Sequence, residues 1–471
     1  MTTAEAIRQP RGAFAALTSR GYRIYLSGQA LANTGSWMQS IAQDWLIFTL
    51  TRSSTAVGVT MALQFLPMLL FGLHTGAVAD RLPKRRILLA TQTLNAVLTL
   101  ALAVVTVAGV VRPGYVYVFA SLTGVIFAFD SPARQAFVTE VVPPAQLRAA
   151  ISLTAAVFQA TRLIGPAIAS MLIVTAGTGW VFAVNAACYL GPTVGLLLLR
   201  PSDLTLVPTA DRSSARSSRG AGSVREAARY VRGRPDLLWT IFLVGTLGTF
   251  GLNFPIVLTA MAKSAFGGTA STYGLFNIIL AIGSCAGALL AATGPRPRQR
   301  VIVGAAAAFG LLQAAAAVMP GLLAFLPVIA AMGFVNLVFQ AMANASVQLA
   351  VEPRLRGRVM GLYLLVFIGG TPIGAPIIGA VTSHFGARAG MALCGAIPAL
   401  AAVLTAVAMA RRRRSGPLTV RSAASAARVT AMTLSYDSFP KRGKRSTARQ
   451  RVIPSSRLTS RTSTTSGDKP A

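Results

Sequence analysis

The sequence contains a series of apolar stretches, each about as long as a helix must be to cross a lipid bilayer. A hydrocarbon core of about 30 Å requires about 20 helical residues. Lipid offers no hydrogen bonds to an exposed backbone, so such stretches are expected to be helices. Twelve of them predict an all-α membrane protein with spans at residues 23–50, 55–79, 87–110, 115–141, 146–175, 180–199, 237–261, 272–293, 301–319, 322–349, 358–382 and 389–410.

Composition indicates that lipid is the solvent for much of this chain. Charged residues make up 12% of the sequence and hydrophobic residues 54%, whereas a soluble domain is about a quarter charged. The formal net charge of +32 would suit nucleic acid, but the basic residues gather between spans and at the C-terminus. A nucleic-acid binder would carry them on a folded soluble face. We therefore expect a multi-pass protein of the cell membrane (plasma or inner) with no nucleic-acid partner.

Loop charges orient the spans, because cytoplasmic loops carry an excess of lysine and arginine. With the N-terminus in the cytoplasm, the outer loops hold only Arg52, Arg112, Lys263 and Arg388. One missing or extra span would place a basic loop outside, so twelve spans and two cytoplasmic termini are expected. The inner loops then carry Arg81, Lys84, Arg85, Arg86, Arg148, Arg296, Arg298, Arg300, Arg354, Arg356, Arg358 and the run from Arg411 to Arg414.

The polar connector at residues 200–236 separates two groups of six spans. It is rich in serine and arginine, and we expect an amphipathic helix near residues 223–232. The two halves resemble each other at a constant offset of 209 residues, as expected of parallel repeats in transporters. The matched pairs are Pro144 with Pro353, Gly165 with Gly374, Gly177 with Gly386, and Asp44 with Asn253.

Five parts follow from this organisation. The tail is rich in serine, threonine and arginine, so we expect it to be disordered. Its charge can attract anionic lipid, or the tail is dispensable. The parts are a cytoplasmic N-terminal segment (1–22), an N-terminal six-helix bundle (23–199), the cytoplasmic connector (200–236), a C-terminal six-helix bundle (237–410) and a basic cytoplasmic tail (411–471).

The loop after the second span reads GAVADRLPKRR over residues 76–86. Gly76 allows close helix packing, and Asp80 is suited to a helix N-terminus, such as the cytoplasmic start of span eleven near residues 358–361. The loop resembles the G-x-x-x-D-R-x-G-R-R loop of the major facilitator superfamily, with Pro83 at the usual glycine. The resemblance implies that this contact closes the cytoplasmic side through Gly76, Asp80, Arg81, Lys84 and Arg85. The alternative is a positive-inside loop with an incidental aspartate.

Span five contains TRLIGPAIAS over residues 161–170, which resembles a reduced form of the superfamily's antiporter motif. Gly165 and Pro166 are its intact centre, and small residues occupy the other glycine positions. The resemblance implies export, whereas an ordinary kinked helix is the alternative. Further stretches resemble one branch, the enterobactin-exporter and macrolide-efflux-like transmembrane secretion effectors. They lie at residues 34–39, 43–46, 131–136 and 356–362, and the resemblance covers about residues 15–410.

Ionisable groups inside the spans are few, because each is costly unless it meets a partner or water. Of the 12 carboxylates, only Asp44 and Asp130 fall well inside spans. We expect Asp44 to take up and release a coupling proton, with Asp130 as the second candidate; a structural contact of Asp44 near the interface is the alternative. Asp130 can pair with Arg134, four residues later on the same helix face. We favour a gating network for this pair over a substrate site.

Arg162 lies near the middle of span five and needs a partner there. Asp130, Asp44, water and an anionic substrate are all open, and a structural ion pair is the alternative to substrate contact. Several amides are further candidates for a substrate cavity, although each alone is more often a helix–helix hydrogen bond. They are Gln43, Gln64, Asn253, Asn336, Gln340 and Asn344.

These features predict a proton-coupled exporter, an antiporter of the multidrug-efflux kind, for a drug-like or siderophore-like small molecule. Alternating access of the two halves would move the substrate. The chain has no phosphate-binding loop for ATP, no catalytic or metal constellation, and is expected to be a monomeric non-enzyme powered by the proton gradient without a cofactor. An importer or uniporter is one alternative. A membrane sensor or assembly partner that does not transport is another.

Overall fold

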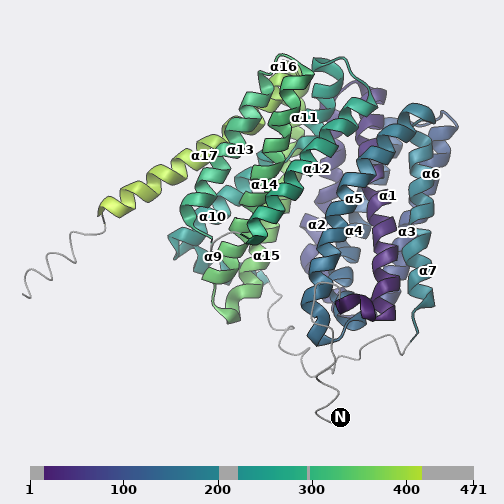
Figure 1. Ribbon diagram of the computed structural model, residues 1–471, viewed down its shortest axis with the longest axis horizontal. Coiled ribbons are helices and arrows are strands. Elements are labelled where there is room, and N and C mark those ends of the chain that lie inside the picture. Colours follow the sequence, from purple (N-terminus) through teal and green to yellow (C-terminus); the bar gives the residue numbers. More distant parts are fainter. Residues whose placement is uncertain (1–14, 201–220, 294–296, 416–471) are drawn as a thin grey trace, which may run out of the picture. The chain divides into compact units, whose positions relative to one another are not determined.

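The computed structural model describes residues 15–200, 221–293 and 297–415, and every regular element in these ranges is a helix (Figure 1). Eleven helical segments are long and apolar enough to cross a membrane. A further helix, α1 (Arg20–Thr51), has 32 residues and is also long enough, but polar side chains such as Gln39, Gln43 and Asp44 lower its hydropathy. The predicted all-α membrane fold is confirmed, with eleven of its spans; the twelfth, at α1, stays a prediction.

The first six predicted spans coincide with helices to within a few residues. Span six bends at Tyr189, where its two helical pieces meet. The helices are α1, α2 (Ser54–Arg81), α3 (Lys84–Val107), α4 (Pro113–Val141), α5 (Leu147–Thr175), α6 (Thr178–Cys188) and α7 (Leu190–Leu198), with short 3-10 turns at Ala15–Thr18 and Pro144–Gln146.

The second half follows the same order with two local departures. Span seven contains two π-helical segments and is interrupted at residues 252–253, just before Pro255. Span eleven is divided at Gly370, where a proline at position 372 cannot continue the hydrogen-bond ladder. The helices are α9 (Ala221–Arg232), α10 (Pro235–Thr246), η6 (Leu247–Gly251), α11 (Phe254–Ala260), η7 (Met261–Ala265), α12 (Ala270–Thr293), α13 (Gln299–Ala317), α14 (Leu322–Ala350), α15 (Pro353–Gly369), α16 (Thr371–Phe385) and α17 (Ala387–Ser415).

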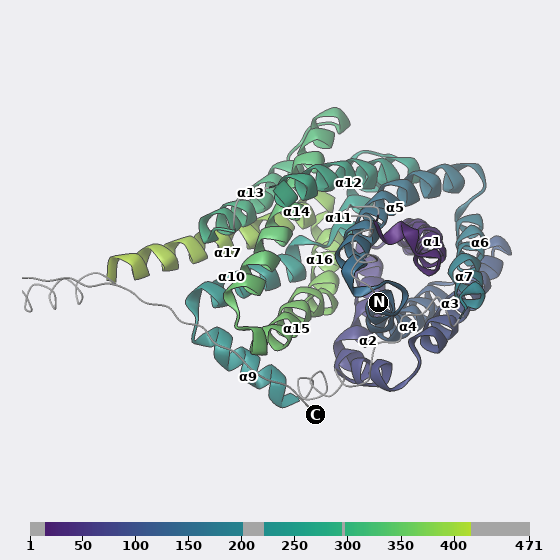
Figure 2. The same ribbon diagram turned by 60° about the horizontal axis from the view of Figure 1, so that its bottom comes forward.

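The prediction that span eleven starts at residue 358 is wrong by five residues, since α15 begins at Pro353. Proline is well suited to the first turn of a helix, where its missing N–H costs no bond. The helix expected in the connector is present as α9, which lies next to α15 (Figure 2). Ala227 and Val231 of α9 are buried, and Glu226 forms an ion pair with Arg358 of α15. Of the predicted disordered tail (411–471), residues 411–415 instead continue helix α17, and the rest lies outside the described residues.

Glycines allow the spanning helices to approach to backbone contact. A Cβ added at Gly124 of α4 would lie 2.3 Å from the main-chain oxygen of Gln64 in α2. A Cβ added at Gly333 of α14 would lie 2.1 Å from the main-chain oxygen of Leu280 in α12. These two glycines are 209 residues apart, so the second and fourth spans of each half meet in the same way. Small residues at such contacts are typical of membrane helices.

Two further pairs at the same offset support the repeat. Gly177 and Gly386 both have a positive φ, of 92° and 91°, just before a helix begins. Gly165 packs against α1, and Gly374 packs against η6, which lies in the second half's first span. The predicted internal repeat is therefore visible in backbone conformation and in helix contacts, at positions where a side chain would not fit.

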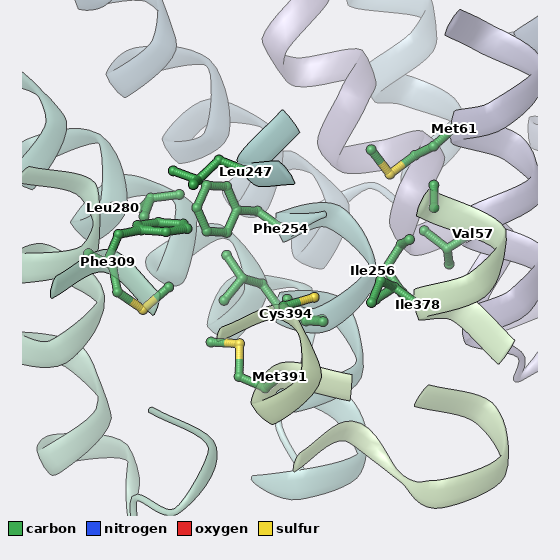
Figure 3. Packing of buried hydrophobic residues seen from close by; sticks show 14 of the residues in the cluster. Val57, Met61, Leu247, Phe254, Ile256, Leu280, Phe309, Ile378, Met391 and Cys394 are labelled. Atoms are coloured by element: carbon green, nitrogen blue, oxygen red, sulfur yellow. The ribbon is translucent and has the colours of Figure 1, made fainter. Parts of the chain in front are cut away.

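Apolar packing continues from one half into the other. Figure 3 shows Phe254, Leu280 and Phe309 packed together within the second half. In the same cluster Ile256 and Ile378 meet Val57 of α2, from the first half. Large apolar side chains that remain exposed, on α3 for example, recur with helical spacing: Leu94, Val97, Leu100, Val104 and Val107. Such a stripe is suited to contact with lipid acyl chains.

We expect Gly124→Ala and Gly333→Ala each to lower the thermal midpoint of the detergent-purified protein. The added methyl group meets a backbone oxygen that cannot turn away, and overpacking of this kind costs about 1–3 kcal/mol. A reporter dye for newly exposed cysteines can follow unfolding.

Gly304→Ala in α13 is the matched control, because nothing lies within 4 Å of the added Cβ. That variant should equal or exceed the wild type, since alanine favours helices by up to about 1 kcal/mol over glycine. Equal midpoints for all three variants would contradict the close approach of these helices.

Candidate functional site

The two ends of the helix bundle differ in charge. One end carries the loops around Lys84, Arg148 and Arg358, and we call it the basic end. The other end carries the turns at residues 52–53 and 176–177 and at Gly386, and we call it the arginine-poor end. At the basic end, Lys84 Nζ lies 3.2 Å from Glu140 Oε1.

The two halves touch each other at the arginine-poor end, through α2 with α16 and through α5 with α12. The Ser383 hydroxyl accepts two hydrogen bonds from Thr55. The backbone N–H of Thr55 donates one at 2.9 Å, and the Thr55 hydroxyl donates the other at 3.1 Å. A Cβ at Gly58 would lie 2.4 Å from the main-chain oxygen of Ala375, and one at Gly379 would lie 2.7 Å from that of Ser54. Glycines on both helices thus permit backbone contact across the junction.

Asp44 lies in this junction and joins α1 of one half to α12 of the other. The hydroxyl of Tyr273 donates a 2.9 Å hydrogen bond to Asp44 Oδ2. Asp44 is 5% exposed and Tyr273 is 1% exposed. Next to them, Lys263 Nζ lies 6.0 Å from the ring centroid of Trp45, a distance suited to a cation–π interaction. The isolated carboxylate of span one therefore has a protein partner from the opposite half.

The span-five motif makes helix contacts within its own half and with the other half. A Cβ at Gly165 would lie 2.5 Å from Cβ of Trp37 in α1, so this glycine packs two helices of one half. At the next residue, the main-chain oxygen of Pro166 lies 3.2 Å from a Cβ added at Gly274 of α12, which belongs to the other half. The hydroxyl of Ser170 bonds to that same oxygen at 2.6 Å. The motif is a packing element in this structure, and its role in export stays a prediction.

Asp130 is the centre of a buried polar cluster within the first half. Its carboxylate is ion-paired with Arg134, as the spacing predicts. Thr91 and Gln92 of α3 donate hydrogen bonds of 2.7 and 3.0 Å to the same carboxylate. Arg134 also donates to Asn33 of α1 at 3.3 Å. Three helices of one half are tied together, and the gating role of the pair stays a prediction.

A second polar cluster lies further along α1. Gln39 accepts hydrogen bonds from Thr99 of α3 at 3.2 Å and from Asn185 of α6 at 2.5 Å. The hydroxyls of Ser36 and Tyr189 are 3.3 Å apart. These hydrogen bonds form inside the half, so helix packing as well as any transport role explains the polar character of α1.

Arg162 lies halfway along α5 and does not meet either expected carboxylate. Within the described residues, its guanidinium has no hydrogen bond or ion pair. Instead it lies over the ring of Trp37, with Cζ 5.5 Å from the centroid. Asp130 is occupied by Arg134, and Asp44 by Tyr273. The structure therefore leaves water or a bound anion as partners for this cation.

The remaining cavity candidates are dispersed. Asn336 and Gln340 are brought together on α14, where Gln340 donates a 2.9 Å bond to Asn336. Asn253 precedes α11 and donates a 2.8 Å hydrogen bond to the main-chain oxygen of Thr249 in η6. Gln43 is buried without a partner for its side-chain oxygen, and Gln64 is half-buried, with its backbone against α4. No single site among the described residues gathers all of them.

The gating loop is described only in part. Helix α2 ends at Arg81. The surroundings of Gly76 and the side chains of Asp80 and Arg81 lie outside the part of the chain that the structure describes. Lys84 pairs with Glu140 of α4, and Arg85 donates a 3.3 Å bond to the main-chain oxygen of Leu197. The expected contact of Asp80 with span eleven stays a prediction.

The structure adds two aromatic residues to the candidate site. The sequence alone assigned neither of them a function. Tyr273 is the partner of Asp44, and Trp37 is the platform beneath Arg162. The signal available was a lone tyrosine hydroxyl in an apolar span, which must find a hydrogen bond when buried. Helix rotation decides which partner it finds, and a single sequence does not supply that rotation.

Comparison with known proteins gives consistent matches along the chain. A family model described as transmembrane secretion effector matches residues 11–443. The staphyloferrin A transporter of Staphylococcus aureus is 23% identical over 262 residues, which are 55% of this chain and 64% of that protein. The multidrug efflux pump Tap of Mycolicibacterium fortuitum is 29% identical over 409 residues, which are 84% of this chain and 97% of the pump.

A solved structure shares the arrangement of helices. The inward-facing crystal structure of a bacterial homologue of the iron transporter ferroportin superposes with a TM-score of 0.63 at 14% identity. The match covers 82% of this chain and 98% of that chain. At this identity it shows a common fold alone.

We expect Arg134→Gln to destabilise the protein strongly, because it leaves the buried charge of Asp130 without its counterion. Loss of one partner of a buried pair costs about 3–5 kcal/mol. The double variant Asp130→Asn with Arg134→Gln should recover part of the lost thermal midpoint. Glu226→Gln is the control, because this carboxylate is 52% exposed in its pair with Arg358, and an exposed pair is worth about 1 kcal/mol or less. Additive losses in the double variant would contradict the pairing.

Proposed function

Because the chain belongs to the transmembrane secretion effector family of major facilitator transporters, we propose that it is a proton-coupled exporter of a drug-like or siderophore-like small molecule. The family match over residues 11–443 supports the transporter class. Relatives named as a multidrug efflux pump and as a staphyloferrin A transporter support the two substrate types. The substrate is a small organic molecule, and no resident cofactor is required.

The basic end is the cytoplasmic end in this proposal, by the positive-inside rule. Both termini then lie in the cytoplasm of a bacterial cell, with the protein acting as a monomer in its plasma membrane. The junction of α2 with α16 joins the halves at the outer side. The structure therefore corresponds to an inward-facing state, and separation of this junction produces the outward-facing state of alternating access.

The observation that carries the coupling proposal is the hydrogen bond from Tyr273 to Asp44 across the junction. A coupling carboxylate must meet different surroundings in the two states, because only a difference in proton affinity links proton movement to conformation. With the halves joined, Asp44 is 5% exposed and bonded to Tyr273. When the halves separate, it loses this partner and faces the outer solution.

The energy source in this proposal is the proton gradient. A proton binds Asp44 from the outer side, crosses as the halves rock, and leaves on the cytoplasmic side. The substrate moves outward in the opposite step of the cycle. Asp44 is the only buried carboxylate of the described spans whose hydrogen bond joins the two halves, since Asp130 is held within one half.

We expect Asp44→Asn to abolish gradient-driven transport while leaving exchange intact. Proteoliposomes with inside-out protein would be given an imposed pH gradient and radiolabelled erythromycin, ethidium or staphyloferrin A. The wild type should accumulate at least one of these compounds, and a protonophore should abolish the accumulation. The variant should still exchange labelled for unlabelled compound at equal pH, because the isosteric amide removes the titratable proton alone.

Gradient-driven accumulation by Asp44→Asn would refute the coupling role of this residue. Flux by the wild type that ignores the gradient would favour a uniporter. Accumulation only in the inward direction would favour an importer. Failure of a broad compound panel to move at all would favour a protein that does not transport.

We expect a disulfide between Thr55→Cys and Ser383→Cys to arrest transport reversibly. The two native side chains lie 3.1 Å apart across the junction, so an oxidised pair would hold the outer ends together. The background would have Cys188, Cys285 and Cys394 replaced by alanine. Each single cysteine variant is the control and should transport normally under oxidation. Full transport by the crosslinked protein would show that this junction need not open.

A further inference from the structure

The charged groups inside the described spans differ in their counterions and hydrogen-bond partners. Asp130 has Arg134 as its counterion and two further hydrogen-bond donors. Asp44 has the hydroxyl of Tyr273. Arg162 alone among these groups has no hydrogen bond or ion pair within the described residues, and only an aromatic ring lies against it. Away from the helix ends, where Arg148 and Lys263 lie, the described spans thus hold one cation without a polar partner and no carboxylate without one.

The position of Arg162 on α5 places it on the inner face of the helix. Phe158, Arg162, Gly165 and Ala169 follow one another at helical spacing, so they lie on one stripe. Gly165 and Ala169 are buried where α5 packs on its neighbours, whereas Phe158, one turn nearer the basic end, is 44% exposed. Arg162 is half-buried between them. It therefore lies where the packed part of this face ends and the part open toward the basic end begins.

The aromatic surroundings fix the guanidinium. Its Cζ is 5.5 Å from the centroid of Trp37, and the Trp37 ring lies 5.8 Å from that of Phe158 at an angle of 60°. Gly165 brings α1 and α5 so close that Trp37 is held against α5. A guanidinium on an aromatic face keeps its N–H fork free for a planar oxyanion.

We propose that Arg162 and Trp37 form an anion subsite, and that the transported molecule carries a carboxylate or similar oxyanion beside a flat apolar group. The oxyanion is bound by the guanidinium, and the apolar group packs on the rings of Trp37 and Phe158. An uncompensated cation inside a span carries a large cost, which a bound anion removes. The inference rests on the proposed transport function and names its substrate class. Lipophilic cations have no free carboxylate to meet within the described spans.

Binding of matched acid and amide probes tests this subsite without any gradient. The probes are 2-naphthylacetic acid with 2-naphthylacetamide, and pyrenebutyric acid with its amide. Dissociation constants would be measured by fluorescence titration of the full chain in lipid nanodiscs, with empty nanodiscs as background. The wild type should bind at least one acid 10-fold or more tighter than its amide, a difference of about 1.4 kcal/mol.

Variants assign the preference to one side chain. Arg162→Met should lose the acid preference and bind acid and amide equally, while Arg162→Lys should retain part of it. Arg148→Met, also on α5 but at the basic end, is the matched control and should keep the wild-type preference. Arg162→Met should also unfold at a temperature no lower than the wild type, because it removes an uncompensated cation; this keeps misfolding from mimicking the result.

Three outcomes would overturn the subsite: equal binding of acid and amide by the wild type, binding of neither, or an acid preference that survives in Arg162→Met. These outcomes are independent of the transport proposal. If gradient-driven flux is intact while the acid preference is absent, the anion subsite fails and the exporter stands. If the preference is present while no gradient drives flux, the exporter proposal fails instead.

Discussion

The lack of water in the bilayer core constrains this structure more than any other factor. Every backbone polar group of a spanning helix must be satisfied within the protein, and an ionisable side chain there is costly unless it meets a partner or water. Asp130 meets this requirement inside one half, through Arg134 and two donors from α3. Asp44 meets it across the halves, through Tyr273. The same constraint therefore makes one carboxylate a fixed structural element and places the other at a junction between two bodies.

Close backbone contact supplies the rest of the cohesion, because lipid tails give apolar helices no hydrophobic reason to associate. Gly124 and Gly333 occupy equivalent places in the two halves, and each meets a main-chain oxygen of the neighbouring span. Gly58 and Gly379 make the same kind of contact between the halves. Contacts inside a half and contacts between halves are thus chemically alike, which suits a junction that separates and re-forms without exposing polar side chains to lipid.

Much of this arrangement could be predicted from the sequence, because span length, loop charge and the repeat at 209 residues are one-dimensional signals. The pairing of Asp130 with Arg134 was predictable for the same reason, since four residues on a helix fix which side chains meet. The partner of Asp44 was not, because it depends on the rotation of α12 against α1. The division of span eleven at Gly370 was missed since its apolar character continues through the break. The aromatic partner of Arg162 could not be predicted, because it depends on how three helices are placed.

The anion subsite has a consequence for how a proton and a substrate are linked. Trp37 and Asp44 are seven residues apart on one face of α1, about 10 Å along the axis at 1.5 Å per residue. An oxyanion at that distance from ionised Asp44 repels it by about 1.7 kcal/mol at an effective dielectric constant of about 20. Charge alone therefore favours joint occupancy by anion and proton, which opposes exchange. An antiporter with this subsite must link proton and anion through conformation. Protonated Asp44 must favour a state that binds the anion poorly, and the resulting loss of anion affinity must exceed about 1.7 kcal/mol. The membrane potential assists such a cycle, because an interior-negative potential of 100 mV drives each exported negative charge by about 2.3 kcal/mol.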